Sequence, residues 1–113
     1  MIKKRIAYVT GSRAEYGIVK RLLKRLQEDI ALDFSLIVTA MHLDSQYGNT
    51  VKIIEQDGFR ISEKIPVKLD SQNNQTILTS MAETLDLFGK HFQQNRYDAA
   101  IVLGDRYEML SVA

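Results

Sequence analysis

The fold is decided by residues 99–108, which read AAIVLGDRYE. The first five residues are all apolar, as in a strand that helices cover on both faces of a parallel sheet. The run stops at Gly104, and the charged residues Asp105, Arg106 and Glu108 follow. Because open α/β sheets bind ligands at the carboxyl ends of their strands, the pattern predicts a buried strand that delivers functional side chains to its end.

A second stretch near the amino terminus has the same design. Residues 6–9 read IAYV and predict a strand, and residues 10–15 then read TGSRAE, again a glycine followed by charge. Two strand ends of this kind predict one shared cleft.

The composition is that of one globular domain. At 113 residues the chain can bury a core but is too short for two ordinary domains. Its 45% hydrophobic and 26% charged residues are ordinary values, and its net charge of +1 argues against a polyanionic partner such as nucleic acid. Basic residues at positions 20, 21, 24 and 25 lie opposite an apolar stripe at helical spacing, so they indicate a solvated helix face.

The chain has no cysteine, which excludes a disulfide framework, a thiolate zinc site and a thiol nucleophile. Its acidic and histidine residues show no metal-ligand spacing, so we expect neither a metal nor another cofactor. The basic start, residues 1–5, precedes too few apolar residues for a signal peptide, and no segment approaches membrane-spanning length. We therefore expect a cytoplasmic protein without a membrane partner.

Apolar periodicity predicts strands and helices in alternation. After the first strand, a helix is expected over about 15–28, a strand over 32–39, and a helix from about residue 50 to Asp57 and Gly58, where glycine tolerates a helix end. The apolar stripe expected to lie on the sheet in the first helix comprises Ile18, Val19, Leu22, Leu23 and Leu26.

The second half continues the alternation. A short, broken strand is expected over 59–67, at a sheet edge because Pro66 lacks a ladder donor. Residues 69–75 predict a mobile polar loop, and a long helix should follow and break near Asn95. The strand over 99–103 comes next, and the chain ends in what we expect to be the start of another helix. The apolar face expected for the long helix comprises Ile77, Leu78, Met81, Leu85, Phe88 and Phe92.

This alternation predicts an α/β fold, a three-layer, doubly wound, Rossmann-like parallel sheet with right-handed crossovers. In the common doubly wound arrangement the four strands lie in the order 3-2-1-4. The order reverses between the first and fourth strands, where the carboxyl ends open a crevice. The topology therefore predicts that residues 11–13 and 104–106 face each other across that crevice.

The turn after the first strand has two interpretations. Gly11 permits a tight turn, and the free backbone donors of the following helix suit an anion such as a phosphate, to which Arg13 could add a bidentate contact. The three-glycine dinucleotide fingerprint and the lysine-containing phosphate loop are both missing, which argues against a nicotinamide or ATP site. Alternatively, Ser12 caps the helix and Glu15 completes a capping box. Both interpretations can hold together.

The remaining polar candidates are also open to two interpretations. Asp105 could cap a helix, with Glu108 three residues later, or act as an acid or base in the crevice. His42 follows the second strand and could reach the same crevice, although a lone loop histidine is more often structural or solvated. His91 lies late on the long helix, and we expect it on the surface.

Four motifs of the chain, taken together and in order, resemble the hydrolysing UDP-N-acetylglucosamine 2-epimerases of sialic acid synthesis. They are residues 10–17 (TGSRAEYG), 41–43 (MHL) with 47–50 (YGNT), 54–59 (IEQDGF) and 103–108 (LGDRYE). The resemblance implies an enzyme that takes UDP-N-acetylglucosamine, eliminates UDP to give a 2-acetamidoglucal, and adds water to release N-acetylmannosamine.

The resemblance also implies roles for particular residues. Asp105 would be a catalytic carboxylate, and Arg106 and Glu108 would support it. Arg13 would contact the nucleotide-sugar phosphates, next to Gly11 and Ser12 in the same turn. His42 would line the substrate pocket. Non-hydrolysing relatives carry a lysine where this chain has Ile18, so a lysine contact is not transferred.

The family resemblance implies a longer protein. Its members have two nucleotide-binding-like domains of GT-B type, with the nucleotide held between them and further catalytic groups beyond the position of Ala113. Residues 1–113 would then be an incomplete amino-terminal Rossmann-like domain, without the second domain. We expect the chain alone to be inactive, its fourth strand to be an exposed sheet edge, and the full-length enzyme to be a homo-oligomer.

Three alternatives stay open at this point. An epimerase of the same kind could act on a related UDP-diacetamido sugar. A two-domain glycosyltransferase would also hold a UDP-sugar in an interdomain cleft. A free-standing binding or receiver module has a similar length, but it would need an acidic cluster where this chain has residues 11–13, GSR.

Overall fold

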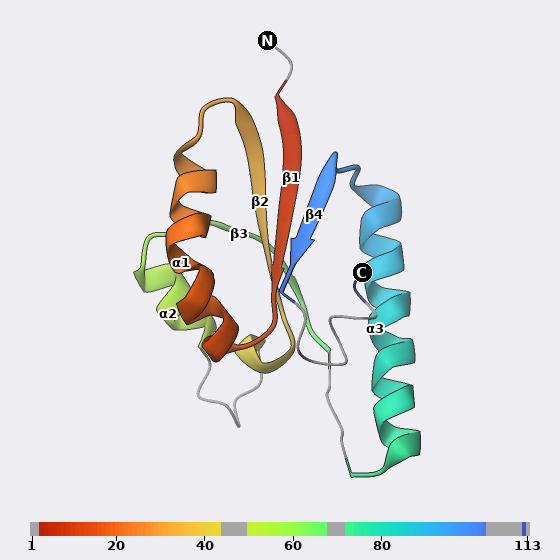
Figure 1. Cartoon of the computed structure of the whole chain (residues 1–113). Helices are drawn as coiled ribbons and strands as arrows, with labels where there is room; N and C mark the ends of the chain where they lie inside the picture. The colour runs from red at the N-terminus through yellow and green to blue at the C-terminus, as the bar shows by residue number, and fades with distance from the viewer. Residues whose placement is uncertain (1–2, 44–49, 68–71, 104–111, 113) are drawn as a thin grey trace.

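The computed structural model describes residues 3–43, 50–67, 72–103 and 112. Four strands form one parallel sheet in the order β3-β2-β1-β4, as the sequence predicts. Figure 1 shows how the strands and helices alternate along the chain. The strands are β1 (Lys4–Thr10), β2 (Leu32–Thr39), β3 (Ile61–Ile65) and β4 (Ala99–Val102). The helices are α1 (Arg13–Glu28), the 3-10 helix η1 (Ala40–Leu43), α2 (Val51–Gln56) and α3 (Asn74–Gln94).

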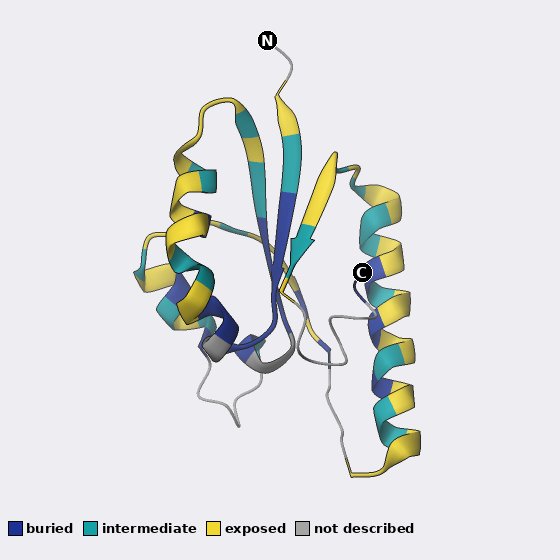
Figure 2. Ribbon diagram, in the orientation of Figure 1, coloured by how far each residue is buried: buried dark blue, intermediate teal, exposed yellow. Residues whose placement is uncertain are grey.

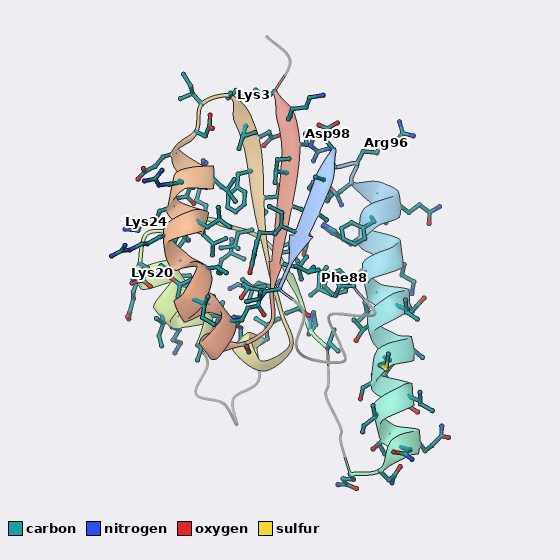
Figure 3. The ribbon with its side chains drawn as sticks, in the orientation of Figure 1. Lys3, Lys20, Lys24, Phe88, Arg96 and Asp98 are labelled. Atoms are coloured by element: carbon teal, nitrogen blue, oxygen red, sulfur yellow. The ribbon has the colours of Figure 1, made fainter. Side chains whose placement is uncertain are left out.

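Helices cover both faces of the sheet, with α1 and α2 on one face and α3 on the other (Figure 1). The side chains of β1 and β2 alternate between these faces. Tyr8 and Leu36 pack in a cluster with α1 and α2, whereas Val9 and Ile37 pack in a cluster that includes Phe88 of α3. Figure 3 shows Phe88 between α3 and the sheet. The three-layer α/β prediction is therefore confirmed.

The turn chemistry of the chain explains several helix ends. Gly58 has a φ of +90°, a left-handed conformation that favours glycine, and it follows the end of α2 as expected. Asn73 and Thr76 form a reciprocal capping box that starts α3. The expected loop over 69–75 is thus too long, because Asn74 already belongs to the helix. Residues 68–71 lie outside the described part of the chain.

The apolar faces expected for the two long helices are partly wrong. In α1, Ile18 is 75% exposed, and Leu22 is also exposed, while Tyr16 and Leu23 are buried. Tyr16 belongs in the core because its hydroxyl donates to Asp57, so its ring is buried without leaving a polar group unpaired. The basic residues at positions 20, 21, 24 and 25 lie on the solvated face of α1 as predicted, and Figure 3 shows Lys20 and Lys24 pointing away from the sheet.

The error is of the same kind in α3. Leu78 and Leu85 are 60% and 58% exposed, whereas Ser80, Thr84 and Phe88 are buried. At about 100° per residue, the buried face is rotated by roughly 70° from the apolar one. The hydroxyls of Ser80 and Thr84 donate to backbone carbonyls one turn earlier, which satisfies them inside the protein.

The fourth strand departs from its expected burial. Ala99 and Ala100 are exposed, and Ile101 and Val102 are half-buried. The reason is that β4 pairs with β1 on one side and, in the part of the chain described, has no strand on its other side. The opposite edge is β3, as predicted, but the strand is shorter than the expected 59–67 and ends at Ile65, before Pro66. No helix in the described ranges is long and apolar enough to span a membrane.

Candidate functional site

Buried polar side chains gather at the carboxyl ends of β1 and β2. Figure 2 shows that burial along these two strands increases toward that edge of the sheet. Among the described residues, all the buried polar ones except Ser80 and Thr84 of α3 belong to this edge cluster, which comprises Thr10, Ser12, Glu15, Thr39, His42 and Thr50. Buried polar groups need partners, so this edge has a specified hydrogen-bonding geometry rather than a merely apolar one.

Hydrogen bonds made by the side chains of Ser12 and Glu15 stabilise the turn from β1 into α1. Ser12 is the N-cap, and its Oγ accepts from the Glu15 backbone N–H at 3.4 Å. The Glu15 carboxylate accepts from the Gly11 N–H at 3.4 Å and from the Tyr8 hydroxyl at 3.1 Å. Burial, together with this carboxylate, raises the pKa of the Tyr8 hydroxyl. The predicted Ser12 cap is confirmed, and the Gly11 N–H, which precedes the helix, donates to Glu15.

His42 lies in η1, immediately after β2, and its side chain is fully buried. Its Nε2 lies 2.9 Å from the Thr10 Oγ1, and its Nδ1 lies 2.6 Å from the Thr50 Oγ1. Burial lowers the pKa of the ring to about 4, opposed in part by the backbone of Ser12. The ring is therefore neutral at ordinary pH, and it joins the ends of β1, β2 and the start of α2.

Tyr16 extends this network toward the surface. Its ring packs edge-on against His42, with centroids 6.2 Å apart, and its hydroxyl donates to Asp57 Oδ2 at 2.5 Å. Lys20 Nζ lies 3.1 Å from the same oxygen. The Tyr16 hydrogen bond first, and then Lys20, lower the pKa of Asp57. These contacts connect α1 to Asp57, the residue that follows α2.

The sequence analysis missed Thr10 and Thr50 as partners of His42. A signal was present in the strands, because β1 and β2 are adjacent and each ends its apolar run with a threonine, at Thr10 and Thr39. Thr50 was interpreted as the start of a helix and as part of the family motif 47–50, and neither interpretation indicated a contact with His42.

The structure brings part of the expected site together. Gly11 and Ser12 are buried next to the partners of His42, and β4 leads to the same edge because Val102 pairs with Val9. The Arg13 side chain and residues 104–108, including Asp105, Arg106 and Glu108, lie outside the described side chains, so their roles stay predictions. In the described ranges no group of three or more His, Cys, Asp or Glu residues could hold a metal ion.

The second histidine is not a simple surface residue, contrary to expectation. His91 is half-buried, its Nε2 lies 2.9 Å from the Tyr97 hydroxyl, and its ring stacks on Tyr97 with centroids 5.8 Å apart. Tyr97 lies just before β4, beyond the end of α3, so the helix end is anchored by an aromatic contact that periodicity does not reveal. A pocket of about 500 Å³ lies beside it, and its described lining residues include Phe92, Ala100 and Val112.

The chain is similar in sequence and in fold to known proteins. The family model described as UDP-N-acetylglucosamine 2-epimerase matches residues 24–113. The chain is 53% identical over 110 residues to polysialic acid biosynthesis protein P7 of Escherichia coli, a match that covers 97% of this chain and 28% of that protein. It is 43% identical over 113 residues to a UDP-N,N'-diacetylbacillosamine 2-epimerase (hydrolyzing) of Legionella pneumophila, covering 100% of this chain and 30% of that protein.

The fold also matches a solved structure. The crystal structure of UDP-GlcNAc 2-epimerase from Neisseria meningitidis bound to UDP-GlcNAc superposes with a TM-score of 0.73 at 16% identity, over 96% of this chain and 28% of that one. The chain thus spans under a third of the length of these similar proteins.

Proposed function

This chain belongs to the UDP-N-acetylglucosamine 2-epimerase family, and on that premise we propose that it works within a longer, hydrolysing UDP-N-acetylglucosamine 2-epimerase of sialic acid synthesis. The observation that carries the proposal is the 53% identity, over 97% of the chain, to a protein named for polysialic acid biosynthesis. Family membership favours an epimerase over the glycosyltransferase and the receiver module. A second substrate, a UDP-diacetamido sugar, is favoured by the 43% identity to the Legionella enzyme.

The proposed reaction has two stages. A base removes the proton from sugar carbon 2 while the bond from carbon 1 to the phosphate oxygen breaks, which releases UDP and leaves a 2-acetamidoglucal. Water then adds its oxygen to carbon 1, and a proton returns to carbon 2 from the opposite face, giving N-acetylmannosamine. The sum is UDP-N-acetylglucosamine plus water to N-acetylmannosamine plus UDP, so the atoms balance without a metal or other cofactor. The chemistry needs a base, an acid or cation at the leaving phosphate, and control of water.

Within this chain we assign Asp105 as the catalytic carboxylate, supported by Arg106 and Glu108. These residues follow β4, the strand that pairs with β1. Arg13 would meet the phosphates through its guanidinium, which matches phosphate geometry. We assign no phosphate contact to the Gly11 amide, because its N–H donates to Glu15.

The rest of the cleft would come from the longer polypeptide. The chain spans 28–30% of the length of the two relatives compared above. We propose that it is the amino-terminal Rossmann-like part of a two-domain, homo-oligomeric enzyme, and that alone it does not turn over substrate. Turnover by the isolated chain, free of longer enzyme, would contradict this.

The proposal is tested with the longer protein and two substrates, UDP-N-acetylglucosamine and UDP-N,N'-diacetylbacillosamine. We expect UDP and N-acetylmannosamine in equal amounts from the first. Asp105→Asn should lower kcat by about 100-fold or more, the scale of a lost general acid or base. Asp33→Asn is the matched control, because Asp33 lies at the exposed amino end of β2.

Two results would decide against parts of this account. Turnover of only the diacetamido sugar would move the substrate to the second candidate. Asp105→Asn activity equal to that of Asp33→Asn would remove Asp105 from the chemistry.

A further inference from the structure

His42 connects three segments that are distant in sequence. Thr10 ends β1, His42 follows β2, and Thr50 directly precedes α2. The ring spans them because its two nitrogens point in different directions, one toward each threonine hydroxyl, at 2.9 and 2.6 Å. A single side chain thus sets the separation of the β1–α1 turn from the start of α2.

In the described part of the chain, the His42 ring is enclosed by other protein groups. Its side chain is fully buried, both nitrogens are within hydrogen-bond distance of protein hydroxyls, and the Tyr16 ring covers it edge-on. A direct contact with substrate would require one of these hydrogen bonds to break. The geometry therefore argues against a role for His42 in direct contact with a sugar or a phosphate.

Histidine suits this bridge for a chemical reason. A neutral imidazole has one N–H donor and one acceptor nitrogen, and a threonine hydroxyl can donate or accept, so the neutral ring can satisfy both threonine partners. The titratable Tyr16 packs against the ring, and its hydroxyl donates to Asp57. Burial keeps the ring neutral, since its pKa lies near 4.

We propose that His42 is a positioning residue, whose bridge from Thr10 to Thr50 holds the β1–α1 turn and the start of α2 in the geometry that binds the UDP-sugar. This inference rests on the proposed function and revises the role that the family resemblance implies for His42. The ring acts through the β1–α1 turn and the start of α2, and it does not contact the substrate.

The bridge is tested first in this chain, by the ¹⁵N shifts of its two histidine rings. The His42 ring is expected to stay neutral, in one tautomer, from pH 8 to pH 5. Thr10→Val and Thr50→Val should each shift its ring nitrogens. Thr84→Val is the control, since Thr84 is equally buried but donates to Ser80 within α3. A His42 ring that titrates near pH 6.5, or that ignores both threonine variants, would overturn the bridge.

The positioning role is tested in the longer protein by steady-state kinetics. Thr10→Val and Thr50→Val should each raise KM for the UDP-sugar about tenfold, the equivalent of one lost hydrogen bond, with kcat changed much less. Thr84→Val should leave both constants unchanged. If His42→Gln raises KM while both threonine variants match wild type, the ring itself touches substrate and the proposal is wrong.

The two proposals fail in different ways. A wild-type protein that turns over neither UDP-sugar would overturn the proposed function. In that case the ring shifts of His42 would still decide whether the bridge exists, and calorimetric titration with UDP would decide whether the threonine variants loosen the site.

Discussion

The two ends of β1 are built from different interactions. At the amino end, Arg5 pairs with Asp33 at 3.5 Å, with both side chains about half exposed, and its guanidinium lies 5.1 Å from the centre of the Tyr97 ring. At the carboxyl end, Thr10 and His42 are fully buried and hydrogen-bonded to each other. Water can replace a lost partner at the first end but not at the second. The contrast teaches that the polar groups of the carboxyl end are held in fixed positions, as a binding site requires.

The largest expected effect comes from removing the buried carboxylate at the carboxyl end. Glu15→Ala should lower the free energy of unfolding by about 2–4 kcal/mol, because it takes the acceptor from the Tyr8 hydroxyl and from the Gly11 N–H. Glu15→Gln should cost less, since its amide can accept from Gly11 and donate to the Tyr8 oxygen. Urea unfolding at pH 7 measures both. If the free energy of unfolding of Glu15→Ala lies within about 0.5 kcal/mol of wild type, the scale of a surface substitution, the two ends of β1 do not differ as argued.

An intermediate effect is expected from acid. The pKa of His42 falls from 6.5 to about 4 on folding, so the unfolded chain takes up the proton first as the pH drops. The stability that the neutral ring contributes is fully present above pH 6.5 and is lost progressively as the pH falls to 4. The loss amounts to about 2 kcal/mol at pH 5. Asp57, whose pKa is lowered, adds a loss only at lower pH, below its ordinary value of 3.8.

The measurement is urea unfolding at half-unit steps from pH 7.5 to 4.5. The slope between pH 6.5 and 4.5 should flatten in His42→Asn, which cannot titrate. An equally steep slope in that variant would assign the acid loss to other groups.

The smallest effect is expected at the amino end. Asp33→Asn removes one partner of an exposed ion pair, so the free energy of unfolding should change by less than about 0.5 kcal/mol. Raising the salt concentration should shrink the difference further. A loss above about 1 kcal/mol would show that this end is as tightly specified as the other.

Much of the fold could be predicted from the sequence because strand and helix periodicity is local. The strand order follows from alternation and the crossover rule, and the bounds of β2 were predicted without error. The resemblance to the epimerases is confirmed by the family match over residues 24–113.

The helix faces could not be predicted from apolarity alone. Tyr16, Ser80 and Thr84 are buried because their hydroxyls find acceptors, and a pattern of apolar residues does not register such pairs. The exposed Ile18 and Leu78 show the other side of the same error.

The site was predicted only in outline for a similar reason. His42 could be placed at the carboxyl edge of the sheet because it follows β2, but its hydrogen bonds join it to residues 32 positions before it and 8 after it. Whether the ring faces a ligand or is buried depends on those partners, which topology brings together and spacing does not reveal. The same holds for Glu15, whose carboxylate turns back toward Tyr8.

The most direct test of the account is proton NMR of the longer protein with UDP-N-acetylglucosamine in deuterated water. The account predicts free N-acetylmannosamine that carries deuterium at carbon 2, because the proposed elimination removes that proton and the solvent replaces it. Free sugar that retains its carbon-2 proton, or substrate that stays intact, would contradict the hydrolysing epimerase.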